Sequence, residues 1–154
     1  MDSLYIDYES EIDKIIAPIE FVERVATLAS SIIGLQEGEV SISFVSQERI
    51  TELNKDYRNK DESTDILSFV QEDDDENFFS IHEEVILGDI VISLVDMNHN
   101  CDYFNVDEKN ELIRLIVHGL LHLHGDDHES NKEEEPMLIL QENIVKQIEK
   151  ELGK

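Results

Sequence analysis

A chain of 154 residues is long enough to bury a sizeable core, and its 40% hydrophobic content indicates a folded protein rather than a disordered acidic tail. The formal net charge of −25, from 37 acidic and 12 basic residues, disfavours diffuse binding to nucleic acid and favours basic protein partners or solubility. With no run of about 18 apolar residues, no signal-peptide pattern in the acidic N-terminus and a lone Cys101, we expect a cytoplasmic protein without a membrane partner.

Strands and helices are predicted in mixed order, so we expect an α+β fold in which about four strands form a small mixed sheet packed with helices. In the first half of the chain the patterns predict a strand at 4–8, a helix from Pro18 to Gly34, a strand at 40–45 and a helix capped by Ser46 and running to Tyr57. The second half is predicted to begin with strands at 65–70 and 87–95 and a short helix at 96–104. A helix at 108–123, capped by Asp107, and a last helix at 133–152 complete the predicted elements. The acidic stretch 71–84 is expected to be an exposed loop. Because no repeat or linker divides the chain, residues 1–154 are expected to form a single domain.

The most informative segment, HGLLHLHGDDH, runs from His118 to His128. Residues four apart stand on one face of a helix, so His118 and His122 can direct both imidazoles at one point. Gly125 can end the helix and let the chain turn back, so that His128 supplies a third nitrogen. Three protein ligands with a free fourth position are the layout of a catalytic zinc, so we expect these histidines to bind one Zn²⁺ per chain.

Apolar residues surround these histidines on nearly all sides of the predicted helix. Burying an imidazole without a partner costs about 1–3 kcal/mol, and a shared metal removes that cost. The alternative is a set of core histidines satisfied by ordinary hydrogen bonds. His124 lies off the shared face and is expected to be exposed, while the isolated His82 and His99 are expected to have no metal role. Nickel would also suit a three-imidazole site, because affinity order alone does not choose zinc.

The spacing of the three histidines is that of the metzincin peptidases, in which a glutamate follows the first histidine and serves as general base. Gly119 occupies that position here. A peptidase built on this segment would therefore have its ligands and lack its base.

The same segment resembles the H-G-x-L-H-L-x-G-Y-D-H signature of the YbeY-type endoribonucleases, the bacterial rRNA maturation factors. LNKDYRNKD, followed by TDILSF, within residues 53–69 is similar to the family's L-N-x-x-Y-R-x-K-D-x-P-T-D-V-L-S-F-P segment, and LGDIVIS at residues 87–93 to its L-G-D-I-x-I-S segment. Ser63 and Val70 replace the two prolines, which predicts a less rigid loop. Asp126 replaces the tyrosine before Asp127, which adds negative charge near the metal.

The resemblance implies a zinc-dependent, single-strand-directed endoribonuclease that acts in 16S rRNA 3′-end maturation and ribosome quality control. It also implies a metal cleft beneath a small mixed sheet, the rRNA of the pre-ribosomal small subunit as partner, and ribosome-associated protein partners. No DNA partner is expected. The alternatives are a non-enzymatic ribosome assembly factor with a structural zinc, and a metal-dependent hydrolase of another ester or amide, including a peptidase.

On this hypothesis zinc lowers the pKa of a bound water toward about 7 and polarises a phosphoryl oxygen. Arg58 is the candidate to hold the phosphate, because its planar fork gives bidentate contacts, although it could instead be a surface arginine paired with a carboxylate. Asp127 could orient an imidazole, relay a proton, or simply bond its own backbone in a turn. Asp65 and Asp89 are interpreted as structural residues, and Cys101 as a small buried residue rather than a nucleophile.

The net charge has one more consequence. A local cationic centre of zinc and Arg58, with Lys60, could hold a few phosphates while the rest of the surface repels bulk RNA. Such a protein would bind free RNA weakly, so we expect a basic ribosomal protein to deliver its substrate.

Overall fold

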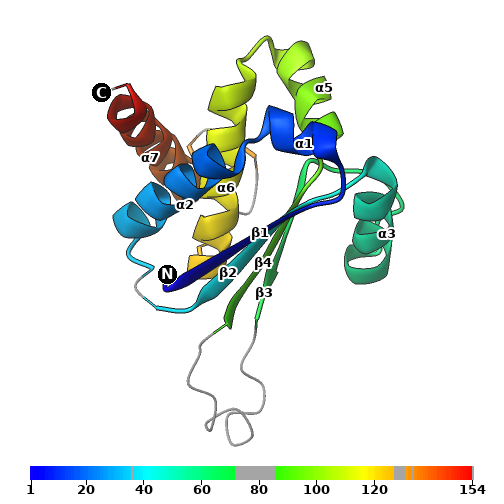
Figure 1. Ribbon diagram of the computed structural model, residues 1–154, viewed down its shortest axis with the longest axis horizontal. Coiled ribbons are helices and arrows are strands. Elements are labelled where there is room, and N and C mark those ends of the chain that lie inside the picture. Colours follow the sequence, from blue (N-terminus) through cyan, green and yellow to red (C-terminus); the bar gives the residue numbers. More distant parts are fainter. Residues whose placement is uncertain (36, 72–85, 127–130, 133, 154) are drawn as a thin grey trace, which may run out of the picture.

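Four strands form one mixed sheet in the computed structural model, which describes residues 1–35, 37–71, 86–126, 131–132 and 134–153 (Figure 1). The strands are β1 (Ser3–Tyr8), β2 (Glu39–Phe44), β3 (Ile66–Val70) and β4 (Ile86–Ile92). Their order is β1-β2-β4-β3, with β1 and β2 parallel, β2 and β4 parallel, and β3 and β4 antiparallel. The predicted α+β fold with a small mixed sheet is confirmed.

Six helices lie within the described residues: α1 (Glu11–Ile16), α2 (Ile19–Ile33), α3 (Gln47–Arg58), α5 (Leu94–Phe104), α6 (Glu108–His124) and α7 (Pro136–Leu152). Helix α6 packs against β3 and β4, and α2 and α7 pack against α6. Helix α3 lies on the opposite side of the sheet from α2, α6 and α7 (Figure 1). We call the face of the sheet toward α6 the inner face and the face toward α3 the outer face.

The alternation of side chains along the strands explains why the two faces differ. On β2, Val40, Ile42 and Phe44 are buried on the inner face, while Ser41 and Ser43 point outward. One buried and one partly solvated face is the usual result of such alternation. The outer face keeps only a small apolar cluster beside α3, made of Val45, Ile50, Leu67 and Val91 with Leu53 and Phe69.

Helix α6 is central to the core, as its apolar sequence predicts. Nine of its residues are buried: Leu112, Ile113, Leu115, Ile116, Val117, Gly119, Leu120, Leu121 and Leu123. The helix approaches the sheet closely at Gly119, where an added Cβ would lie 2.8–3.0 Å from three side-chain atoms of Ile90. Asp107 accepts a hydrogen bond from the backbone N–H of Asn110 at the start of the helix, and Gly125 ends it in the left-handed conformation, as predicted.

Several predicted boundaries are wrong for local reasons. Helix α1 was not predicted, because it has six residues and buries none of them. Pro18 precedes α2 as its N-cap, with ψ of 142°. The strand predicted to reach residue 95 ends at Ile92, because Ser93 caps α5 by accepting a hydrogen bond from the backbone N–H of Asp96. The last helix begins at Pro136, three residues later than predicted. Of the predicted acidic loop, residues 72–84 lie outside the described residues.

No helix in the described ranges has both the length and the apolar character needed to cross a membrane.

Candidate functional site

His118 and His122 lie one turn apart near the C-terminal end of α6, and the structure brings their rings together. The ring centroids are 4.6 Å apart, and the two Nε2 atoms are 3.1 Å apart. The remaining nitrogen of each ring faces an oxygen: His118 Nδ1 lies 2.6 Å from Oε1 of Gln141, and His122 Nδ1 lies 3.1 Å from the backbone oxygen of Asp126. In each ring, therefore, Nδ1 lies at hydrogen-bond distance from an oxygen and Nε2 faces Nε2 of the other ring.

The chemistry of this pair fits a cation. A carbonyl oxygen only accepts, so a ring whose Nδ1 bonds one carries its hydrogen there and presents a lone pair at Nε2. Two lone pairs 3.1 Å apart repel each other unless a proton or a metal lies between them. Two nitrogens on a tetrahedral zinc, each about 2.0–2.1 Å from it, are about 3.3 Å apart. The separation of the two imidazoles therefore suits two ligands of one zinc.

The third predicted ligand, His128, and the predicted catalytic residue Asp127 lie outside the described residues. Among the residues that the structure describes, no group of three or more His, Cys, Asp or Glu side chains comes together as a metal site. The structure therefore places two of the three predicted ligands, and the complete site stays a prediction.

The imidazole pair opens onto a pocket of about 720 Å³ beside β3. Its lining comes from the end of α3 and the loop after it, from β3, and from the end of α6: Arg58, Lys60, Ile66, Leu67, Ser68, Val70, His118, His122, Gly125 and Asp126. Two cationic side chains and one carboxylate belong to this described lining. That balance is the reverse of the whole chain, in which acidic residues outnumber basic ones three to one.

Arg58 is fixed at the rim of this pocket. Its Nη2 donates to the backbone oxygen of Ser68 at 2.6 Å, and its guanidinium carbon lies 5.3 Å from the centre of the Phe69 ring. Within the described ranges, no carboxylate lies within ion-pair distance of Arg58. The alternative of an arginine paired with a surface carboxylate therefore has no support among these residues.

The loop that carries Lys60 is anchored on both sides despite its missing proline. The buried Asn54 donates its side-chain N–H to the backbone oxygen of Glu62 at 2.9 Å, and its own backbone oxygen accepts from the N–H of Lys60 at 3.2 Å. Ser63, which stands where the family has proline, donates to Asp96 of α5 at 2.8 Å. These bonds tie the loop to α3 and α5 and hold it beside the pocket.

Asp126, another departure from the family signature, acts here through its backbone as well as its side chain. Its carboxylate lies 2.8 Å from Nδ1 of His124, while its backbone oxygen faces His122. His124 is exposed, as predicted from its position off the shared face. The negative charge of Asp126 is thus paired with His124 when that ring is protonated.

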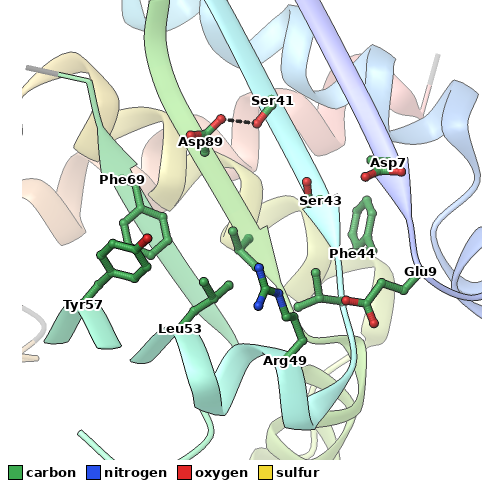
Figure 2. Close-up of a pocket in the computed structure, with 12 residues that line it drawn as sticks. Asp7, Glu9, Ser41, Ser43, Phe44, Arg49, Leu53, Tyr57, Phe69 and Asp89 are labelled. Atoms are coloured by element: carbon green, nitrogen blue, oxygen red, sulfur yellow. Dashed lines mark hydrogen bonds between the residues drawn. The ribbon is translucent and has the colours of Figure 1, made fainter. Parts of the chain in front are cut away.

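Asp89 lies on the outer face of the sheet and not in the histidine pocket. Its carboxylate accepts from the Ser41 hydroxyl at 2.5 Å, across the pairing of β4 with β2 (Figure 2). The surrounding hollow, of about 470 Å³, also holds Asp7 and Glu9, with Arg49 as its basic residue. Three carboxylates against one cation make this hollow less suited to a phosphate than the histidine pocket, whose described lining has two cations and one carboxylate.

Other residues considered from the sequence also lie outside the pocket. Asp65 accepts a hydrogen bond from Asn100 of α5, and burial raises the pKa of its carboxyl group. Cys101 is buried, and burial together with nearby carboxylates such as Glu111 raises the pKa of its thiol, as suits a small core residue. His99 is exposed on α5, and His82 lies outside the described residues.

Sequence reasoning missed Gln141 of α7, which contacts His118 from 23 residues away. No motif includes it, and its only signal is a polar residue on the apolar face of a predicted helix. Asn54 was also not singled out, although it lies within a segment that resembles the family.

An α+β protein with two facing imidazoles and two cations in one pocket has the features of an enzyme acting on phosphate esters. A family model described as "Endoribonuclease YbeY" matches residues 6–149. The chain is 40% identical over 147 residues to the endoribonuclease YbeY of Treponema denticola, covering 95% of this chain and 93% of that protein. It is 39% identical over 148 residues to the corresponding protein of Geobacillus thermodenitrificans, covering 93% and 95%.

A solution structure agrees with these sequence matches. TM1509 from Thermotoga maritima superimposes with a TM-score of 0.64 at 27% identity, over 97% of this chain and 91% of that one. The chain belongs to the endoribonuclease YbeY family. It is accordingly a nuclease that hydrolyses phosphodiester bonds in RNA, in a family of metalloproteins.

Proposed function

We propose that this chain is a zinc-dependent, single-strand-directed endoribonuclease that acts in 16S rRNA 3′-end maturation and ribosome quality control, with residues 1–154 forming one domain. The observation that carries the proposal is the pair of facing imidazoles in a pocket whose described lining is cationic, in a chain of net charge −25. Membership of the YbeY family supports RNA as the substrate.

In this proposal His118, His122 and His128 hold the zinc. When bound, the metal supplies Lewis acidity toward a phosphoryl oxygen and lowers the pKa of water. Arg58 holds the phosphate with the N–H groups that it does not use on Ser68, and its fixed guanidinium needs little reordering to do so. Asp127, the residue before the third ligand, orients an imidazole or carries a proton.

Delivery of the substrate depends on the charge distribution. Arg58 and Lys60 can hold only a few phosphates, and the acidic remainder of the surface repels a long polyanion. We therefore propose that a basic ribosomal protein brings the pre-ribosomal small subunit to the enzyme, that the site of action is the cytoplasm where rRNA matures, and that DNA is not a substrate.

A peptidase of the metzincin type has less support, for a packing reason. Position 119, where such an enzyme carries its general base, faces Ile90 of the sheet rather than the pocket. A Cβ at position 119 would lie 2.8–3.0 Å from side-chain atoms of Ile90, so a base placed there would start against the sheet and would need Ile90 to shift.

The test is to measure zinc content and cleavage of rRNA-derived single strands for the wild type, His122→Ala, Arg58→Ala and the exposed control His99→Ala. We expect His122→Ala to lose both zinc and cleavage, because a ligand is gone. Arg58→Ala should keep zinc and lose cleavage by about 10-fold or more, less than the loss on removing a fully enclosed transition-state donor, because Arg58 is an exposed residue at the rim of the pocket. His99→Ala should match the wild type.

Unchanged cleavage by His122→Ala would end the metal-nuclease proposal. If cells carrying these variants lost rRNA processing while the wild-type enzyme showed no cleavage in the tube, the role of a non-enzymatic assembly factor with a structural zinc would be favoured instead.

A further inference from the structure

Gln141 of α7 meets His118 from outside every motif of the sequence. Its side chain is buried, with an exposed fraction of 6%. Its Oε1 lies 2.6 Å from Nδ1 of His118, and its Nε2 donates to Oε2 of Glu142 at 3.1 Å. The amide thus joins a predicted metal ligand to a carboxylate on its own helix.

Glu142 is in turn fixed by Arg114 of α6, which lies one helical turn before His118. Arg114 donates from Nε to Oε2 of Glu142 at 2.8 Å and from Nη2 to Oε1 at 2.9 Å, a two-point contact that sets the plane of the carboxylate. The same guanidinium also bonds Asn110 at 2.7 Å and Glu111 at 3.3 Å. Its hydrogen bonds to Glu142 lower the pKa of that carboxyl group, which is therefore ionised and can only accept.

An acceptor-only carboxylate settles which way the amide of Gln141 points. The NH₂ group must face Glu142, so the oxygen must face His118. An oxygen opposite Nδ1 requires a hydrogen on that nitrogen, and the lone pair of the ring is then at Nε2, the atom directed at His122. The reversed amide would set an oxygen against the carboxylate, and it would move the ring hydrogen to Nε2, where it blocks a metal.

We infer that Gln141 is a positioning residue for His118, and that Glu142 and Arg114 fix its orientation so that Nε2 of His118 faces the metal with its lone pair. The inference rests on the proposed zinc site. It also separates the two helix ligands: His118 depends on a side chain of α7, whereas His122 is held by the backbone oxygen of Asp126, which no substitution removes.

The main test uses Gln141→Leu, which keeps the size of the side chain and removes the acceptor. We expect the zinc dissociation constant, measured by competition with a chromophoric chelator, to rise by about 10- to 100-fold, the usual effect of losing such a partner. The visible bands of the Co²⁺-substituted protein should also shift, because the ring of His118 is no longer held. Ile144→Val is the matched control: it removes one buried methyl group from the same helix and should leave zinc affinity and spectrum unchanged.

Two further variants keep the test decisive if Gln141→Leu does not fold. Glu142→Gln leaves the amide of Gln141 in place but lets it turn over, so we expect a smaller loss of zinc affinity. The double exchange Gln141→Glu with Glu142→Gln places a carboxylate acceptor opposite Nδ1 of His118 and an amide donor at position 142 to hold that carboxylate. Its zinc affinity should be higher than that of Gln141→Leu or of Glu142→Gln alone.

The inference fails alone if the wild type binds zinc, His122→Ala does not, and Gln141→Leu and Glu142→Gln both bind within twofold of the wild type with an unchanged Co²⁺ spectrum. A wild-type chain that binds no zinc would overturn the proposed function and this inference together.

Discussion

Among the single residues that the structure describes, Asp65 is a carboxylate whose burial conflicts with its charge. Burial raises the pKa of its carboxyl group above the ordinary 3.8, and the hydrogen bonds from Asn100 and from the backbone N–H groups of Asp65 and Ile66 only partly offset that effect. The folded state therefore binds the proton more tightly than the unfolded state does. Stability attributable to this group falls as pH rises from about 3.8 through the raised value, and it stays lost at neutral pH.

Asp65→Asn should therefore stabilise the protein at pH 7, because an amide keeps an acceptor for Asn100 and cannot ionise. We expect the gain in melting temperature over the wild type to shrink as pH falls and to vanish below about pH 3.8. Thermal unfolding of both proteins at several pH values between 3.5 and 7 measures it. A variant that is destabilised at pH 7 and matches the wild type at low pH would show that the native structure stabilises the ionised carboxylate.

The predictable part of the site is the part set by local geometry. The four-residue spacing of His118 and His122 on a long apolar helix is enough to place both rings on one face, and the structure brings them together. Gln141 could not be predicted, because its contact with His118 depends on how α7 is rotated against α6. That rotation is decided by packing between the two helices, which the sequence of either one leaves open.

At the scale of elements, predictions are correct where local sequence marks both the buried face and the ends of an element, and wrong where it does not. Helices α2 and α6 bury a long periodic face, and their ends are marked by Gly34 and Gly125, each in the left-handed conformation. Helix α1 has Ile12, Ile15 and Ile16 at helical spacing, but with six residues and none of them buried it is too short for that pattern to predict a helix. The change from β4 to α5 at Ser93 falls inside one apolar run, so only the cap marks it.

Asn54 couples the end of α3 to the pocket, and its removal should affect substrate binding without affecting the metal. Asn54→Ala breaks the bond to Glu62 and loosens the loop that carries Lys60. We expect a loss of about 1–2 kcal/mol in unfolding free energy and a higher KM for RNA, with unchanged zinc affinity. Urea unfolding, cleavage kinetics and chelator competition give the three values.

Thr51→Ala is the matched control on the same helix, because its hydroxyl donates within α3, to the backbone oxygen of Gln47 at 2.7 Å, and to no other part of the described chain. It should leave KM unchanged. If both variants raised KM equally, the loop anchored by Asn54 would have no separate part in holding the substrate.

Over the whole molecule, charge is distributed in a way that total composition does not reveal. The histidine pocket and the outer hollow lie on different sides of the sheet, the first with mainly cationic and the second with mainly acidic charged side chains in its described lining. The net charge of −25 is readable from the sequence, but the gathering of Arg58 and Lys60 beside the imidazoles depends on the path of the loop between α3 and β3. Long-range repulsion and local attraction therefore act on the same RNA.

The balance between those two forces predicts an unusual dependence on salt. Repulsion between the acidic surface and RNA acts over the Debye length, which falls from about 30 Å at 0.01 M salt to about 8 Å at 0.15 M. Attraction in the pocket acts at contact, where screening is weaker. For the proposed nuclease, kcat/KM on a short single strand should thus rise as KCl increases over this range, whereas binding by a basic protein falls with salt.

Reversing two exposed acidic residues on α2, Glu20→Lys and Glu23→Lys, should flatten this rise, because it weakens the repulsion without touching the pocket. Cleavage rates at limiting RNA concentration, with zinc held constant, measure both proteins at each salt concentration. If kcat/KM of the wild type fell steadily from the lowest salt, attraction would dominate at every distance. The substrate would then reach the pocket unaided, and the need for a basic partner to deliver it would disappear.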